Sequence, residues 1–206
     1  MTQHNQRQDF DYPNPQMGLV LKHFYEQHPE VVDRAGQEFF GYVQAVQERV
    51  AQEKIEQLFN EWLAYDFLLK TGKTALETYI YRNPDELDED ELDLMQQAGD
   101  SSYVGHFLIG EVSAETELMV LYECGTGVSY EVRDMTATQS VQSNAGLISA
   151  RIIKLDGNWY FASDPIYFLP IPPPADGASG QSFIDTVKLH YGMWNVPVVD
   201  DENGAT

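Results

Sequence analysis

The spacing of hydrophobic residues changes from a helical to an extended pattern near residue 100, and this change constrains the fold most. Before Gly99, apolar residues recur at the spacing of amphipathic helices. After it, short runs rich in β-branched and aromatic residues alternate with turn residues. These runs occupy residues 103–112, 118–122, 129–133, 147–155 and 159–161. The pattern predicts an α+β protein in which a helical N-terminal half precedes a small antiparallel β-barrel or curled sheet. A parallel sheet is not expected, because no helix long enough for a crossover separates the runs.

Three stretches of the N-terminal half carry an apolar stripe at helical spacing: residues 16–27, 31–50 and 54–69. Pro29 ends the first helix and opens the second. The sequence leaves open whether the second and third stretches run together as one bent helix. Gly72 is a natural stop for the third, because a residue without a Cβ takes positive φ without a clash.

Capping signals predict two further helices. Thr74 and Glu77 have the spacing of a capping box, which predicts a short helix that ends at Tyr81 or Arg82. Asn83 followed by Pro84 then reads as the N-cap and first position of a strongly acidic helix.

Turn and linker signals set the boundaries in the C-terminal half. Asp156-Gly157 between two β-type runs predicts a two-residue hairpin. A proline-rich stretch then precedes an aromatic, helix-patterned segment at 182–195, which we expect to dock on its own chain or to form a homodimer. The predicted organisation is an arm at 1–14, a helical region at 15–99, an antiparallel β domain at 100–170, a linker at 171–181, and a docking segment with a tail at 182–206.

Charge is unevenly distributed along the chain. The chain has 33 acidic residues against 12 Lys and Arg, for a net charge of −21. Residues 1–83 carry 12 acids and 8 bases, whereas residues 84–206 carry 21 acids and 4 bases. Such a surface repels nucleic-acid phosphates and anionic membranes, so neither is an expected direct partner. The acidity serves either solubility or the recognition of a basic protein.

The densest acidic stretch lies between residues 85 and 93 and is the predicted partner-binding segment. A solvated helix face is the alternative interpretation of the same residues. The candidate partner-binding residues are Asp85, Glu86, Asp88, Glu89, Asp90 and Glu91.

Two charged residues fall in apolar patterns. Asp66 follows Trp62 by four positions and is expected on the apolar helix face, where a carboxylate needs a partner. Lys73, the backbone or hydroxyl of Thr74, Arg82 and a tyrosine hydroxyl are candidate partners, and a general base is the functional alternative. 

The second of these residues is Arg151, which interrupts an apolar strand. We expect it to pair with Asp134 or Asp156, and the binding of an anionic ligand is the alternative. Trp62, Asp66 and Arg151 are the candidates for lining a pocket between the two halves.

No motif of known chemistry stands out. The five histidines lack metal-ligand spacing, Cys124 is the single cysteine, and nucleotide-binding and nucleophile-elbow motifs are absent from the sequence. We therefore expect no metal, no cofactor and no identifiable catalytic residue. No apolar run reaches the roughly 18 residues of a membrane span, and the first residues are polar, so a cytoplasmic location is expected.

Two segments carry a family resemblance. Residues 59–67 with 72–77, and then 146–153 with the Asp156-Gly157 hairpin, resemble uncharacterised bacterial proteins that often carry a SEC-C zinc motif elsewhere. The resemblance covers roughly residues 55–165. The metal motif itself is absent, and the resemblance implies the two-part layout without an activity.

These observations favour a non-enzymatic binding or adaptor protein with an acidic surface. An enzyme of unknown reaction, with its pocket between the halves, is the alternative. A nucleic-acid mimic that inhibits a DNA-binding protein is a third. A filled interface between the halves favours the adaptor, and a deep pocket with convergent polar groups favours the enzyme.

Overall fold

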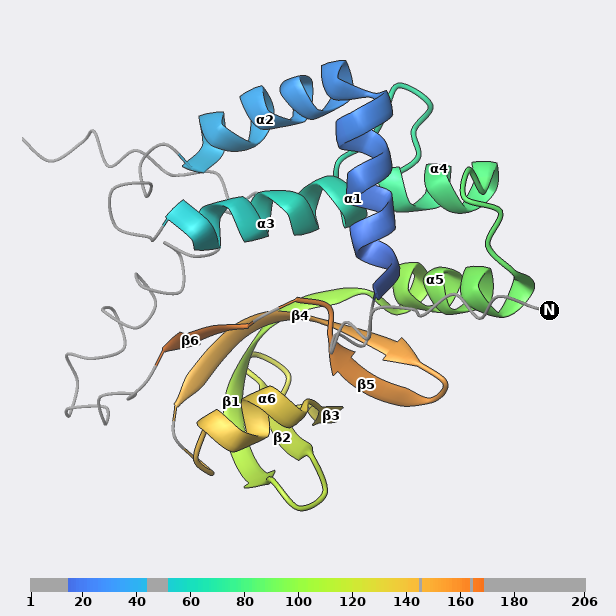
Figure 1. The fold of residues 1–206 in the computed structure, drawn as a ribbon. Helices are drawn as coiled ribbons and strands as arrows, with labels where there is room; N and C mark the ends of the chain where they lie inside the picture. The colour runs from blue at the N-terminus through green and yellow to red at the C-terminus, as the bar shows by residue number, and fades with distance from the viewer. Residues whose placement is uncertain (1–14, 44–51, 145, 164, 169–206) are drawn as a thin grey trace, which may run out of the picture.

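The computed structural model describes residues 15–43, 52–144, 146–163 and 165–168 (Figure 1). The predicted arm at 1–14, the linker at 171–181, and the docking segment and tail at 182–206 lie outside the described residues. The dimer contact expected of residues 182–195 therefore lies outside them as well.

Helices precede strands along the chain, as predicted. The helices of the N-terminal half are α1 (Pro15–Gln27), α2 (Pro29–Val43), α3 (Gln52–Tyr65), α4 (Ala75–Arg82) and α5 (Glu89–Ser101). They are followed by β1 (Tyr103–Ser113), β2 (Leu118–Glu123), β3 (Ser129–Arg133), α6 (Met135–Ser140), β4 (Leu147–Leu155), β5 (Asn158–Phe161) and β6 (Ile166–Phe168). The α+β class, with a helical half before a small barrel, is confirmed. The short helix α6 was not predicted.

Helices α2 and α3 are two separate helices that lie side by side and run in opposite directions (Figure 1). Their apolar stripes meet through aromatic rings: the ring of Phe39 lies 5.4 Å from that of Phe59 and 5.5 Å from that of Trp62. This answers the question that the sequence left open. Packing two amphipathic helices face to face buries both stripes, which one bent helix could not do by itself.

The loop between α3 and α4 begins earlier than expected. Helix α3 ends at Tyr65, whereas the pattern extended it to Leu69, and Gly72 adopts its positive φ of 77° within the loop. The capping box of α4 is confirmed. The amide of Glu77 donates to the Thr74 hydroxyl at 3.1 Å, and the amide of Thr74 donates to the Glu77 carboxylate at 2.7 Å.

The N-cap predicted at Asn83 is wrong. Asn83 instead closes α4 in the left-handed conformation at φ 42°, and its side chain bonds to both backbone groups of Leu87. Helix α5 begins at Glu89 behind a second capping box, formed by Asp88 and Glu91. Asparagine satisfies either role, because it tolerates positive φ as well as capping amides.

The strands form a closed barrel in the order β1-β2-β3-β5-β4, with β4 returning to β1 and β6 added beside β4. Within the described strands, every pairing is antiparallel except β3 with β5, which is parallel. The fully antiparallel arrangement that we expected therefore fails at one pairing. The predicted hairpin explains it: Asp156 and Gly157 both take positive φ, at 47° and 83°, and turn β5 back from β4 into the direction of β3.

Strand β4 is buried on both faces and joins the two hydrophobic cores. Ile148, Ala150 and Ile152 point into the barrel core, whereas Ile153 and Leu155 pack against the helices. Because side chains alternate along a strand, Arg151 lies on the helix-facing side. The helical half and the barrel thus share a continuous interface across β4 (Figure 1).

Candidate functional site

Arg151 is the centre of a buried polar network between the helical half and the barrel. Its side chain is 3% exposed, and each guanidinium nitrogen donates a hydrogen bond. Nε donates to Glu61 Oε1 at 3.0 Å, Nη1 to Ser102 Oγ at 2.6 Å, and Nη2 to Asp66 Oδ2. Ser163 Oγ completes the cluster by donating to the second oxygen of Glu61. We call these residues the Arg151 network: Glu61, Asp66, Ser102, Arg151 and Ser163.

The two carboxylates of the Arg151 network differ in exposure. The Glu61 side chain is 2% exposed, whereas that of Asp66 is 35% exposed because Asp66 lies just beyond the last residue of α3. Burial raises the pKa of the Glu61 carboxyl above its ordinary value, and the nearby Arg151 guanidinium opposes that shift without cancelling it. The pKa of Asp66 is raised for the same reason. One cation therefore serves two carboxylates.

The predicted partners of these charges are wrong. Asp66 pairs with Arg151 and not with Lys73, Thr74 or Arg82. Arg151 pairs across the interface, whereas Asp134 caps α6 by accepting from the Ala137 amide at 2.7 Å.

Asp156, the other expected partner of Arg151, occupies the hairpin turn. Trp62 is a core residue whose ring lies 5.1 Å from that of Phe67. Asp66 and Arg151 are in direct contact, and none of the three pocket candidates lines the pocket described below.

Glu61 and Ser163 were not singled out from the sequence. Glu61 follows Leu58 by three positions and precedes Tyr65 by four, so the helical period places it on the buried face. A carboxylate on a buried helix face, together with an arginine inside an apolar strand, is the signal from which the pairing of Glu61 with Arg151 could have been predicted. Each of the three guanidinium nitrogens of Arg151 bonds to a side chain of the helical half or the segment before β1, so the Arg151 network fastens α3, the residues at the end of α5 and β4 together.

The acidic segment divides into carboxylates with structural partners and carboxylates without them. Asp85 accepts a hydrogen bond from the Tyr79 hydroxyl, and Asp88 and Glu91 form the capping box of α5. Burial and the bond to Asp85 raise the pKa of the Tyr79 hydroxyl. The remaining candidates are Glu86, Glu89 and Asp90, which are exposed and make no hydrogen bond or ion pair within the described part of the chain.

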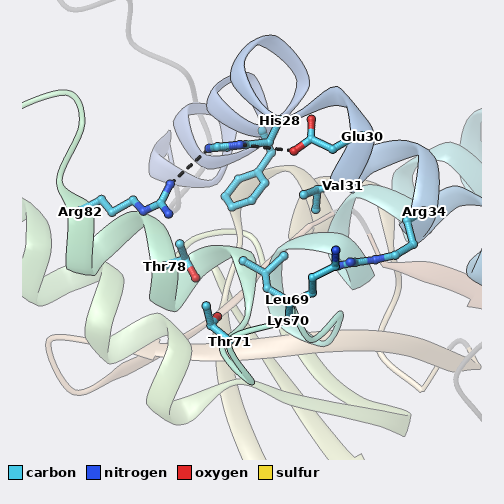
Figure 2. Close-up of a pocket in the computed structure, with 10 residues that line it drawn as sticks. His28, Glu30, Val31, Arg34, Leu69, Lys70, Thr71, Thr78 and Arg82 are labelled. Carbon is cyan, nitrogen blue, oxygen red and sulfur yellow. Dashed lines mark hydrogen bonds and ion pairs between the residues drawn. The ribbon is translucent and has the colours of Figure 1, made fainter.

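A pocket of about 430 Å³ lies in the helical half (Figure 2). Residues from α1, α2 and α4 and from the loop after α3 line it. Its lining residues are Phe24, His28, Glu30, Val31, Arg34, Leu69, Lys70, Thr71, Thr78 and Arg82. The volume falls within the range of about 300–1,000 Å³ that small-molecule sites occupy.

The described residues show no group of three or more His, Cys, Asp or Glu that could hold a metal ion. Among the same residues, no helix is long and apolar enough to cross a membrane.

Comparison with known proteins adds no relative. No protein-family model, no curated protein and no solved structure matches the chain. The resemblance to bacterial proteins that often carry a SEC-C motif therefore stays a prediction.

Proposed function

We propose that this protein is a non-enzymatic binding or adaptor protein whose acidic surface recognises a basic protein. The observation that carries the proposal is the exposure of Glu86, Glu89 and Asp90 beside carboxylates that already have structural partners. Neither the capping box nor the Tyr79 bond uses these three side chains. Their charges are therefore available to a partner.

Helix α5 holds Glu89 and Asp90 on a rigid base, and Glu86 lies in the loop just before this helix. Met95 and Ala98 are each 1% exposed in the core, and Gln97 accepts from the Asp156 amide at 2.8 Å. Ser101 accepts from the Lys154 amide at 2.7 Å. A helix fixed at this many points loses little conformational freedom when a partner binds, which favours association.

The enzyme alternative receives less support. At the interface between the halves, the guanidinium nitrogens of Arg151 each bond to a side chain of the protein. Internal pairing of this kind supports a structural interface, as in an adaptor, over a catalytic one. The nucleic-acid mimic is a special case of the adaptor, in which the basic partner is a DNA-binding protein.

A charge-matched comparison tests the proposal. In the acidic-segment variant, Glu86→Gln, Glu89→Gln and Asp90→Asn remove three charges. They leave the capping box of Asp88 and Glu91 intact. The control variant removes three exposed charges from the barrel instead, by Glu111→Gln, Glu115→Gln and Glu131→Gln.

Binding of a hexa-arginine peptide and capture of basic proteins from a bacterial lysate are then measured at low salt and at 0.15 M salt. We expect the acidic-segment variant to lose most binding and the control to keep it, with both weakened by salt because exposed charges are screened beyond about 8 Å. Equal binding by the two variants would refute a specific role for the segment. A captured protein that also binds DNA would favour the mimic.

We also propose a cytoplasmic location. Supporting it is the single cysteine, Cys124, which is half-buried and whose thiol pKa is raised by that burial. A thiol of this kind is a poor nucleophile and suits a reducing compartment.

A further inference from the structure

Cations gather at the pocket of the helical half. Three of the chain's twelve Lys and Arg residues, Arg34, Lys70 and Arg82, line it, against a single acid, Glu30. In a chain with a net charge of −21, this local excess of positive charge runs against the overall composition. Figure 2 shows Arg82 on one side of the pocket and Arg34 with Lys70 on the other.

The single acid lies near a histidine on the rim. Arg82 Nη1 lies 3.3 Å from His28 Nε2, and His28 Nδ1 lies 3.8 Å from Glu30 Oε1 (Figure 2). A guanidinium can only donate, so Nε2 accepts and the ring proton faces Glu30 from Nδ1. Neither Arg34 nor Lys70 forms an ion pair within the described residues, and the Arg34 guanidinium lies over the Phe67 ring at 5.0 Å.

A buried hydroxyl in the pocket wall lacks a hydrogen-bond partner. Thr78 is 8% exposed, and its Oγ1 has no hydrogen bond among the described residues. A threonine within a helix ordinarily bonds to the carbonyl four residues earlier. Thr78 lies in the pocket wall (Figure 2), and its Oγ1 is itself covered by neighbouring atoms, so a ligand oxygen would satisfy this hydroxyl only if the wall shifts to uncover it.

We propose that this pocket binds a small organic anion, in which an apolar body carries one carboxylate or phosphate group. The charged group would lie between Arg34 and Lys70, and a small shift of the wall would bring the Thr78 hydroxyl into contact with it. Phe24, Val31 and Leu69 supply the surface for the apolar body. Charge-assisted hydrogen bonds in a partly desolvated pocket are strong enough to select the anion over a neutral molecule of the same shape.

Three rigid probes test this site with the full chain in isothermal titration calorimetry. Naphthalene-2-carboxylate and 2-naphthyl phosphate carry the anionic groups, and naphthalene-2-carboxamide is the neutral counterpart. We expect both anions to bind with Kd values below about 1 mM, and the amide at least tenfold more weakly. The tighter of the two anions identifies the preferred head group. Equal binding of the carboxamide, or no binding of either anion at 1 mM, would overturn the proposal.

Two lysines of one loop provide a matched pair of variants. Lys70 lines the pocket, whereas Lys73 does not and lies over the Tyr81 ring at 4.6 Å. Lys70→Gln should weaken anion binding about tenfold, and the double variant with Arg34→Gln further. Lys73→Gln should leave Kd within about twofold. If Lys73→Gln weakened anion binding as much as Lys70→Gln does, the anion would be attracted by the general positive charge of the loop and would not bind in this pocket.

Thr78→Val separates a ligand-binding hydroxyl from a structural one. Valine keeps the shape of the side chain, so removing an unsatisfied hydroxyl should keep or raise the melting temperature. Anion binding should nevertheless weaken about fivefold or more, because one hydrogen bond to the ligand is lost. A lower melting temperature with unchanged binding would assign the hydroxyl to the fold and contradict its role in the site.

Discussion

Replacing Arg151 by methionine should lower the free energy of unfolding by about 3–5 kcal/mol, because it leaves a buried charge without its counter-ion. Methionine keeps most of the apolar stem, so little of this cost comes from packing. Most of it comes from Glu61, which is 2% exposed and cannot be rehydrated in the folded state. Asp66 contributes less, because its side chain is 35% exposed and water can replace the guanidinium.

Urea unfolding followed by circular dichroism measures the effect. Arg133→Met is the matched control, because Arg133 is exposed and its Nε makes a single long hydrogen bond to Asn158 at 3.3 Å. The control should change stability by less than about 0.5 kcal/mol.

A second substitution isolates the cause. Adding Glu61→Gln to Arg151→Met removes the stranded charge and should recover at least about 1 kcal/mol. If Arg151→Met unfolds at the same urea concentration as Arg133→Met, the Arg151 network contributes no net stability and the reasoning is refuted.

Three further perturbations have defined expectations. Since burial raises the pKa of Glu61 above 4.5, its ordinary value, the folded state binds that proton more tightly than the unfolded chain. The free energy of unfolding should therefore rise as pH falls toward about 4.5, and Glu61→Gln should flatten this dependence in urea titrations at several pH values. Asp88→Ala removes the cap of α5 and should lower the free energy of unfolding by about 1 kcal/mol in the same assay. Asp90→Asn removes a charge without removing a cap, so it should cost less. Gly110→Ala should cost about 1–3 kcal/mol by thermal melting, because a Cβ would lie 2.5 Å from Tyr122, whereas Gly125→Ala meets nothing within 4 Å.

Features governed by neighbouring residues were predictable from the sequence. The capping box at Thr74 and the hairpin at Asp156-Gly157 each depend on a few consecutive residues whose backbone preferences agree. The N-cap predicted at Asn83 was wrong because a local signal can be ambiguous. An asparagine fits the end of one helix as well as the start of another. Helix α6 has few apolar residues and spans only Met135–Ser140, so its periodic signal was too short to detect.

The Arg151 network could not be paired from the sequence, because its contacts are distant along the chain. Glu61 and Arg151 are separated by 90 positions, and Ser163 lies 102 positions from Glu61. Strand alternation places Arg151 on one face of β4, but it does not say which helix covers that face. The pocket could not be predicted because its lining comes from several helices and a loop. Whether a cavity forms between them depends on how they pack, which the sequence pattern does not give.

Cations are sparse beside the acids of α5 and the barrel. Arg151 is buried and paired in the interface between the halves, and Arg34, Lys70 and Arg82 line the pocket of the helical half. Among the described residues after Pro84, Arg133 and Lys154 are then the exposed cations left beside the acids of α5 and the barrel. Because these two are few beside so many carboxylates, the proposed basic partner would encounter a largely negative field there, although Arg82 is exposed three positions before Asp85. Adding a cation to that face, as in Asp90→Lys, should therefore weaken binding of the basic peptide more than Asp90→Asn does, since it adds local repulsion to the lost attraction. Equal effects of the two substitutions would mean that single contacts, and not the field, govern the encounter.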